Sequence, residues 1–177
     1  TSPWRAAGDA TKALQGTGLK ASLHIRMTLG PPGLKQTDDN WVAERAAKAI
    51  SAAAAFEDIH VYADTFADVD RGYYRRHGVV DRFCNPRPAF DVVRHLNGAL
   101  ASSHPFAPDG ESQTVSLIGA DGRRFDLLKG AEAPSGMSES QPGVLIDLGT
   151  GERVAIENGP GAPRKSGSGL RLWARDA

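Results

Sequence analysis

Two stretches of the chain alternate between apolar and polar residues, which is the pattern of a strand with one buried face. They are residues 19–28 (LKASLHIRMT) and residues 58–66 (DIHVYADTF). In the first stretch, Leu23, Ile25 and Met27 fall on the apolar side. We therefore expect two strands that each bury one face and present polar groups on the other.

Three further stretches place apolar residues three or four positions apart, which predicts helices. The first covers residues 2–14, where a serine followed by a proline suits a helix start. The second covers residues 40–56 and pairs Glu44 with Lys48 on its solvent side. Its expected cap is Thr37, Asp38 or Asp39, and its expected buried stripe is Val42, Ala46, Ala49, Ile50, Ala53 and Phe56.

The third helix opens at Pro86 and Pro88. Its expected periodic positions are Phe90, Val93, Leu96, Asn97 and Leu100. The order of elements is helix, strand, helix, strand, loop, helix, and a helical crossover between two strands predicts that the strands are parallel.

The polar faces of the two strands decide between the common folds with parallel sheets. A doubly wound sheet needs apolar residues on both faces. A (β/α)8 (TIM) barrel instead has helices outside, and polar side chains near its strand ends point into the mouth. Two strands do not close a barrel, so we expect the last β/α units of one. The remaining barrel segment or another chain would complete the sheet.

The pattern changes at His104. Residues 104–112 are rich in turn formers, and five short apolar segments separated by turn signals follow them. The expected fold class is therefore α/β, followed by a small antiparallel β domain. We place the C-terminal part of the barrel at residues 1–103 and the accessory β domain at residues 104–177.

Composition excludes several classes of function. The 21 basic and 21 acidic residues balance, so no global charge favours nucleic acid, and no apolar run is long enough to span a membrane. Cys84 is the only cysteine, which rules out an internal disulfide and cysteine-rich metal sites. Phosphate-binding and dinucleotide fingerprints are missing. We expect no cofactor and no metal.

Residues 64–88 gather charged side chains of both signs in one loop. Most of them are expected to pair with one another and to shape the loop. The others are candidates for ligand contact at the mouth of a barrel. Asp64 ends the second strand and has two open interpretations, a loop anchor or a functional carboxylate. The further candidate ligand contacts in the loop are Asp70, Arg71, Tyr73 and Tyr74.

His24 and Arg26 share the polar face of the first strand. As a ligand-facing pair they would suit an anionic or hydroxyl-rich substrate. The alternative is a buried polar network that neighbours such as Tyr62 and His60 satisfy. The sequence leaves both interpretations open.

Residues 78–96 (GVVDRFCNPRPAFDVVRHL) resemble the closing segment of many (β/α)8-barrel glycoside hydrolases. The residues that match this pattern are Gly78, Val79, Asp81, Pro86, Arg87, Pro88 and Ala89. In such enzymes the last helix packs against the barrel, and a β-sandwich often follows. The resemblance implies a carbohydrate ligand and, for a complete barrel, hydrolase activity on a poly- or oligosaccharide.

The resemblance departs from the family at one position. Such hydrolases usually place a catalytic Glu at the end of the seventh strand, but the strand in that place ends in His24, Arg26 and Thr28, with no carboxylate. Hydrolysis needs two carboxyl groups at a defined separation. We therefore keep as alternatives a non-catalytic carbohydrate-binding or interaction module derived from such a barrel, and a barrel enzyme for another polar metabolite.

Overall fold

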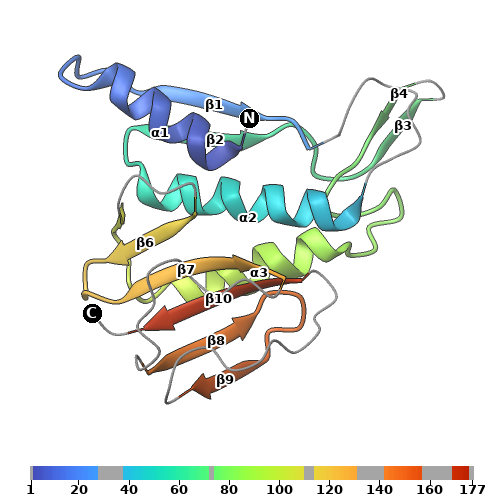
Figure 1. Ribbon diagram of the computed structural model, residues 1–177. Helices are drawn as coiled ribbons and strands as arrows, with labels where there is room; N and C mark the ends of the chain where they lie inside the picture. The colour runs from blue at the N-terminus through green and yellow to red at the C-terminus, as the bar shows by residue number, and fades with distance from the viewer. Residues whose placement is uncertain are drawn as a thin grey trace.

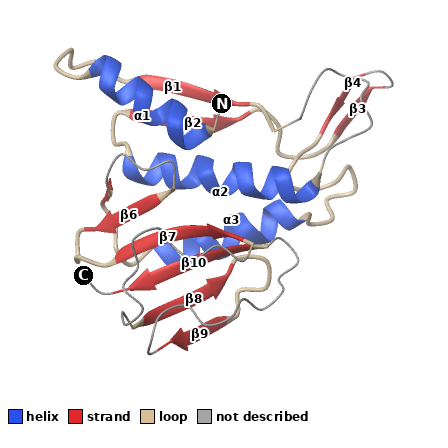
Figure 2. Ribbon diagram, viewed as in Figure 1, coloured by secondary structure: helices blue, strands red, loops and turns tan. Residues whose placement is uncertain are grey.

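The computed structural model describes residues 2–27, 38–71, 74–109, 114–130, 142–156 and 169–175. These residues form three helices and ten strands, arranged in layers with helices between two sheets (Figures 1 and 2). The elements of the first hundred residues are α1 Pro3–Leu14, β1 Ala21–Ile25, α2 Asp39–Ala55, β2 Ile59–Ala63, β3 Val69–Arg71, β4 Tyr74–Arg76 and α3 Pro88–Leu100.

β1 and β2 are parallel, as the sequence predicted, and α2 is the crossover between them. Their register runs from Ala21 opposite Ile59 to Ile25 opposite Ala63. α2 begins where it does because the Asp38 side chain accepts a hydrogen bond from the Asn40 backbone N–H at 2.8 Å. A side-chain acceptor at this position satisfies one of the backbone donors that a helix start leaves unpaired.

The strands described after residue 103 form one antiparallel sheet. Its strands are β5 Phe106–Pro108, β6 Ser116–Gly119, β7 Arg124–Lys129, β8 Gly143–Asp147, β9 Arg153–Ile156 and β10 Leu170–Arg175. The spatial order is β5-β6-β7-β10-β8-β9, so the last strand lies between two earlier ones. Part of the segment 104–112, which is rich in turn formers, is a strand, because Phe106 to Pro108 pair with β6.

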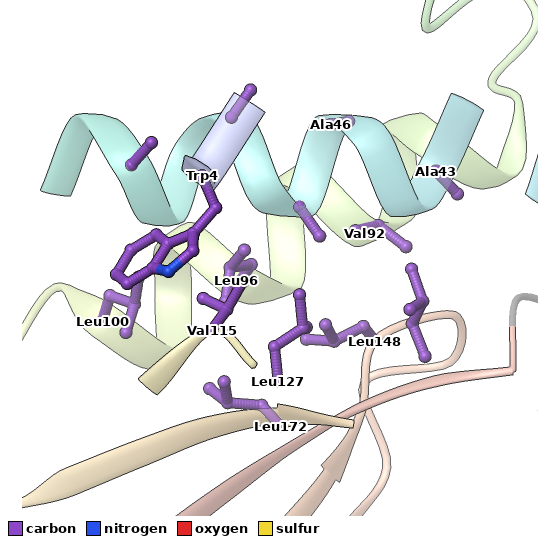
Figure 3. Packing of buried hydrophobic residues seen from close by; sticks show 14 of the residues in the cluster. Trp4, Ala43, Ala46, Val92, Leu96, Leu100, Val115, Leu127, Leu148 and Leu172 are labelled. Atoms are coloured by element: carbon purple, nitrogen blue, oxygen red, sulfur yellow. The ribbon is translucent and has the colours of Figure 1, made fainter. Parts of the chain in front are cut away.

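One hydrophobic core joins the helices to the antiparallel sheet. Leu96 and Leu100 of α3 pack with Leu127 and Leu172 of the sheet, and all four are almost fully buried (Figure 3). Trp4 of α1 belongs to the same cluster. The core therefore crosses the boundary placed between residues 103 and 104. The division into two domains stays a prediction.

The structure corrects several predicted helix faces. Ala53 of α2 and Asn97 of α3 are exposed, and α2 buries Ala43, Ala47 and Ser51 instead. α2 is buried on several sides because β2, α1, α3 and β5 all contact it. A helix in the middle of three layers does not keep a single apolar stripe.

Glu44 and Lys48 pair at 2.6 Å, but their side chains are only 17% and 27% exposed. Glu44 also pairs with Lys129 of β7 at 2.7 Å. The predicted solvent-facing pair therefore faces the antiparallel sheet and ties α2 to it.

Among the described residues, the parallel sheet has only two strands. The strands β5 to β10 form one sheet and not the two packed sheets of a sandwich. The partial barrel and the β-sandwich thus remain predictions. Within the described ranges, no helix is long and apolar enough to cross a membrane.

Candidate functional site

The parallel pair β1–β2 has one face covered by helices and one face of exposed polar side chains. Ile25, Met27 and Ile59 are buried in the core on the helix side. His24 and Tyr62 alternate with these residues and are exposed. The polar face therefore turns away from the helices, as the face that lines a barrel interior does.

His24 and Tyr62 form a stacked pair on this face. They are direct partners in the strand register, their ring centroids are 5.4 Å apart, and their planes differ by 23°. Tyr62 is nevertheless 51% exposed. A stacked pair with open edges presents hydrogen-bonding groups beside an apolar ring surface. That combination suits a ligand with both hydroxyl groups and apolar faces.

Asp64 binds the backbone at the carboxyl end of β1. Its Oδ1 accepts a hydrogen bond from the Met27 N–H at 3.0 Å, and its own N–H donates to the Ile25 carbonyl at 3.0 Å. Nε of Arg45 donates to the Arg26 carbonyl at 2.5 Å. Burial lowers the pKa of Arg45, and the negative charge of Asp64 opposes that shift. Asp64 thus anchors the carboxyl end of β1.

Arg87 is the centre of the pairing within the charged loop. It donates to Asp39 of α2 at 3.0 Å and makes a short hydrogen bond to Asp68. Asp68 also accepts from the Gly78 N–H at 2.8 Å. Burial acts to lower the pKa of Arg87, but the hydrogen bonds and charges of Asp68 and Asp39 outweigh it and raise the pKa. These contacts confirm the predicted pairing of Asp68 with Arg87 within the loop. Arg87 also pairs outside the loop, with Asp39 of α2.

Asp81 closes a tight turn at the end of the same loop. It accepts backbone N–H groups from Phe83 and Asn85, both at 2.8 Å, and the Asn85 side-chain amide at 2.8 Å. The amide of Asn85 is the main reason that the pKa of Asp81 is lowered. Cys84 has a φ of 65° within this turn. Asp81 therefore shapes the loop.

The predicted site residues fall into two groups. His24, Arg26 and Asp64 lie together on or at the end of the parallel pair. Asp70, Arg71 and Tyr74 belong to the β3–β4 hairpin, where Arg71 is opposite Tyr74. The side chains of these three residues, and all of Tyr73, lie outside the described residues.

Sequence reasoning missed Arg45 as a residue of this site and treated Tyr62 only as a neighbour of His24. The alternation of β2 placed Tyr62 on the polar face, so its pairing with His24 follows once the register is known. Arg45 carries no such signal, because its contact with Arg26 joins residues 19 positions apart in the chain.

A cavity of about 240 Å³ lies between α2 and the antiparallel sheet, away from the polar face. Its charged lining is Glu44, Lys48 and Lys129, and both lysines pair with Glu44. Burial acts to raise the pKa of Glu44, but the hydrogen bonds from Lys129 and Lys48 outweigh it and lower the pKa. No three His, Cys, Asp or Glu side chains among the described residues are grouped to hold a metal ion.

No protein-family model and no curated protein matches the chain. Solved structures do match it. A glycoside hydrolase of family 5 from Bacteroides vulgatus ATCC 8482 has a TM-score of 0.58 and 14% identity, over 99% of this chain and 45% of that one. A second glycoside hydrolase has a TM-score of 0.56 and 14% identity, over 99% of this chain and 46% of its own length.

At this identity the likeness concerns the fold alone. The fold is similar to that of glycoside hydrolases, and the chain spans less than half the length of either structure.

Proposed function

We propose that this chain is the C-terminal portion of a (β/α)8-barrel glycoside hydrolase that acts on a poly- or oligosaccharide, at a barrel-mouth site completed by residues outside this chain. The polar face of β1–β2 is the observation that carries the proposal. It is turned away from the helices and bears the stacked His24–Tyr62 pair. The fold likeness to glycoside hydrolases supports the class of ligand.

The proposed site needs further protein to be complete. β1 and β2 pair only with each other among the described strands, so their outer edges have no strand partner there. Parallel sheets normally contain several strands covered on both faces. The partner is the remaining barrel segment or another chain that supplies the neighbouring strands. His24 and Arg26 would contact the sugar from this side of the mouth.

A second candidate function is carbohydrate binding without hydrolysis. The observation that favours it is at the end of β1. Residues 25–28 include no carboxylate that could act in hydrolysis. Oδ1 of Asp64, the carboxylate at the end of β2, already binds the Met27 N–H. A pair of carboxyl groups at a defined separation is required for glycoside hydrolysis.

One experiment separates these functions. The full-length protein is incubated with a panel of neutral and acidic oligosaccharides, and both product formation and binding are measured. Cleavage supports the hydrolase. Binding without cleavage supports the second candidate. If the full-length protein neither binds nor cleaves any sugar of the panel, the carbohydrate proposal is wrong.

A further inference from the structure

The peptide group between Arg26 and Met27 has both of its polar atoms bound by charged side chains. Its carbonyl oxygen accepts from Nε of Arg45 at 2.5 Å, and its N–H donates to Oδ1 of Asp64 at 3.0 Å. A cation therefore binds the acceptor and an anion binds the donor of the same peptide. Hydrogen bonds to charged groups are stronger than neutral ones. We call Arg45 and Asp64 the peptide clamp.

The two residues of the peptide clamp come from different elements. Arg45 belongs to α2, and its guanidinium lies 5.2 Å from the centre of the Trp41 ring on the same helix. Asp64 follows β2 directly, and its N–H donates to the carbonyl of Ile25 at 3.0 Å. The peptide clamp thus fixes the end of β1 against both α2 and β2.

A peptide that is bound at both polar atoms cannot rotate, and its orientation sets the directions of the side chains on either side. Met27, on one side, is only 1% exposed and packs in the core. Arg26, on the other side, is exposed and alternates with the core residues in the same way as His24. The clamped peptide therefore holds Arg26 on the polar face.

We propose that Arg45 and Asp64 are positioning residues that aim Arg26 at the sugar ligand. This inference rests on the proposed carbohydrate site. It adds the two residues that set the direction of the Arg26 side chain, the cation of that site. Asp64 then acts through its hydrogen bond to the Met27 N–H, and its carboxylate does not contact the ligand. The charge of Arg26 binds a sugar hydroxyl or carboxylate oxygen.

Variants that either remove or keep the hydrogen-bonding group of each clamp residue test the roles of the peptide clamp. The affinity of the full-length protein for a bound oligosaccharide of the panel is measured by calorimetry. Arg45→Met removes the donor and Asp64→Leu removes the acceptor, and each should weaken binding about tenfold. Arg45→Lys keeps a donor and Asp64→Asn keeps an acceptor oxygen, so each should lose only about threefold. Arg5→Met, at an exposed arginine of α1, is the matched control and should bind like the wild type.

A double-mutant cycle separates positioning from a general loss of structure. If the peptide clamp acts through Arg26, then Arg45→Met should cause no further loss of affinity in a protein that already carries Arg26→Ala. The amide signal of Met27 should shift in Arg45→Met and Asp64→Leu. The thermal melting of Arg45→Lys and Asp64→Asn shows that these conservative variants fold.

The outcomes that overturn the inference are distinct from those that overturn the proposed function. Full additivity of Arg45→Met and Arg26→Ala contradicts an action through Arg26. Loss of binding in Asp64→Asn with an unchanged Met27 amide signal means that the carboxylate contacts the ligand, and positioning is then wrong. If the wild-type protein binds no sugar, the proposed function fails, and this inference fails with it.

Discussion

In the antiparallel sheet of the described residues, four of the six strands have a neighbour on both sides, whereas β1 and β2 pair only with each other. Some antiparallel strands pair with their neighbours in the chain, as β5, β6 and β7 do and as β8 does with β9, and β10 then joins these two groups by pairing with both β7 and β8. Parallel strands need a crossover for every neighbour. Within the described residues, β1 and β2 therefore have no further strand beside them, and their polar face is exposed.

The two regions also differ in where their polar groups lie and what they contact. In the antiparallel sheet the buried charges have partners, as Asp126 does with Arg175 at 3.2 Å. In the parallel pair, polar side chains such as His24 and Tyr62 stay exposed on one face. The difference places the candidate site on the two-stranded parallel pair. It also predicts that the regions respond differently to substitution.

The largest expected effect is on the core that the two regions share. Leu96 of α3 has no exposed surface and packs against both the helices and the antiparallel sheet. Leu96→Ala should lower the free energy of unfolding by about 2–5 kcal/mol, because a cavity forms in a core that cannot collapse fully. Unfolding in urea, followed by circular dichroism and tryptophan fluorescence, measures the change.

Both regions should unfold in one transition in that experiment. Leu19→Ala, at a leucine that is 62% exposed, is the matched control and should change stability little. Two separate transitions, with only one of them shifted by Leu96→Ala, would mean that residues 1–103 and 104–177 are independent domains.

A smaller effect is expected from the charged loop, which belongs to the parallel region only. Arg87→Met removes the hydrogen bonds to Asp68 and Asp39 and should cost about 2 kcal/mol. Arg82→Met in the same loop removes a cation that lies 4.6 Å from the Phe83 ring centre. It should cost less than about 1 kcal/mol. Equal losses in the two variants would contradict the central role of Arg87.

A third effect tests the link between the regions and depends on pH. The pKa of Glu44 is lowered from its ordinary value of 4.5, so its ion pairs stabilise the fold above that value. Stability should fall by on the order of 1 kcal/mol as the pH decreases through the lowered pKa. Glu44→Gln should remove this part of the pH dependence, whereas Glu57→Gln, at an exposed position, should retain it. Melting temperatures between pH 2 and pH 7 are the measurement.

Local sequence patterns predicted the buried face of an element correctly where that element packs against only one layer of the protein. The alternation in β1 and β2 gave their faces, because only one face of each strand contacts the helices, and the period of residues 40–56 gave the position of α2 in the chain. The face of α2 was wrong at Ala53, and the pair Glu44–Lys48 was placed on the wrong side. α2 has neighbours on several sides, and no local period encodes the position of Lys129.

The candidate site was predictable in part for the same reason. Alternation put His24 and Arg26 on one face, and the strand register then placed Tyr62 beside His24. The contact of Arg45 with the Arg26 carbonyl depends on how α2 packs across the end of β1. The sequence near either residue carries no trace of it.

The last prediction compares one substitution in two settings, and its effect is smallest in the chain of residues 1–177. Tyr62 is 51% exposed and contacts His24 by stacking, so Tyr62→Ala in the chain of residues 1–177 should cost only about 0.5–1.5 kcal/mol. If further strands complete the barrel, the same face becomes an interior. In a longer protein that contains those strands, the loss should rise to about 3–5 kcal/mol, the usual cost of removing a buried aromatic side chain. His60→Ala, at the polar start of the same strand, provides a control for general strand effects. Denaturant unfolding of both proteins gives the two values, and equal small losses would show that the polar face stays open to solvent and is not the inside of a barrel.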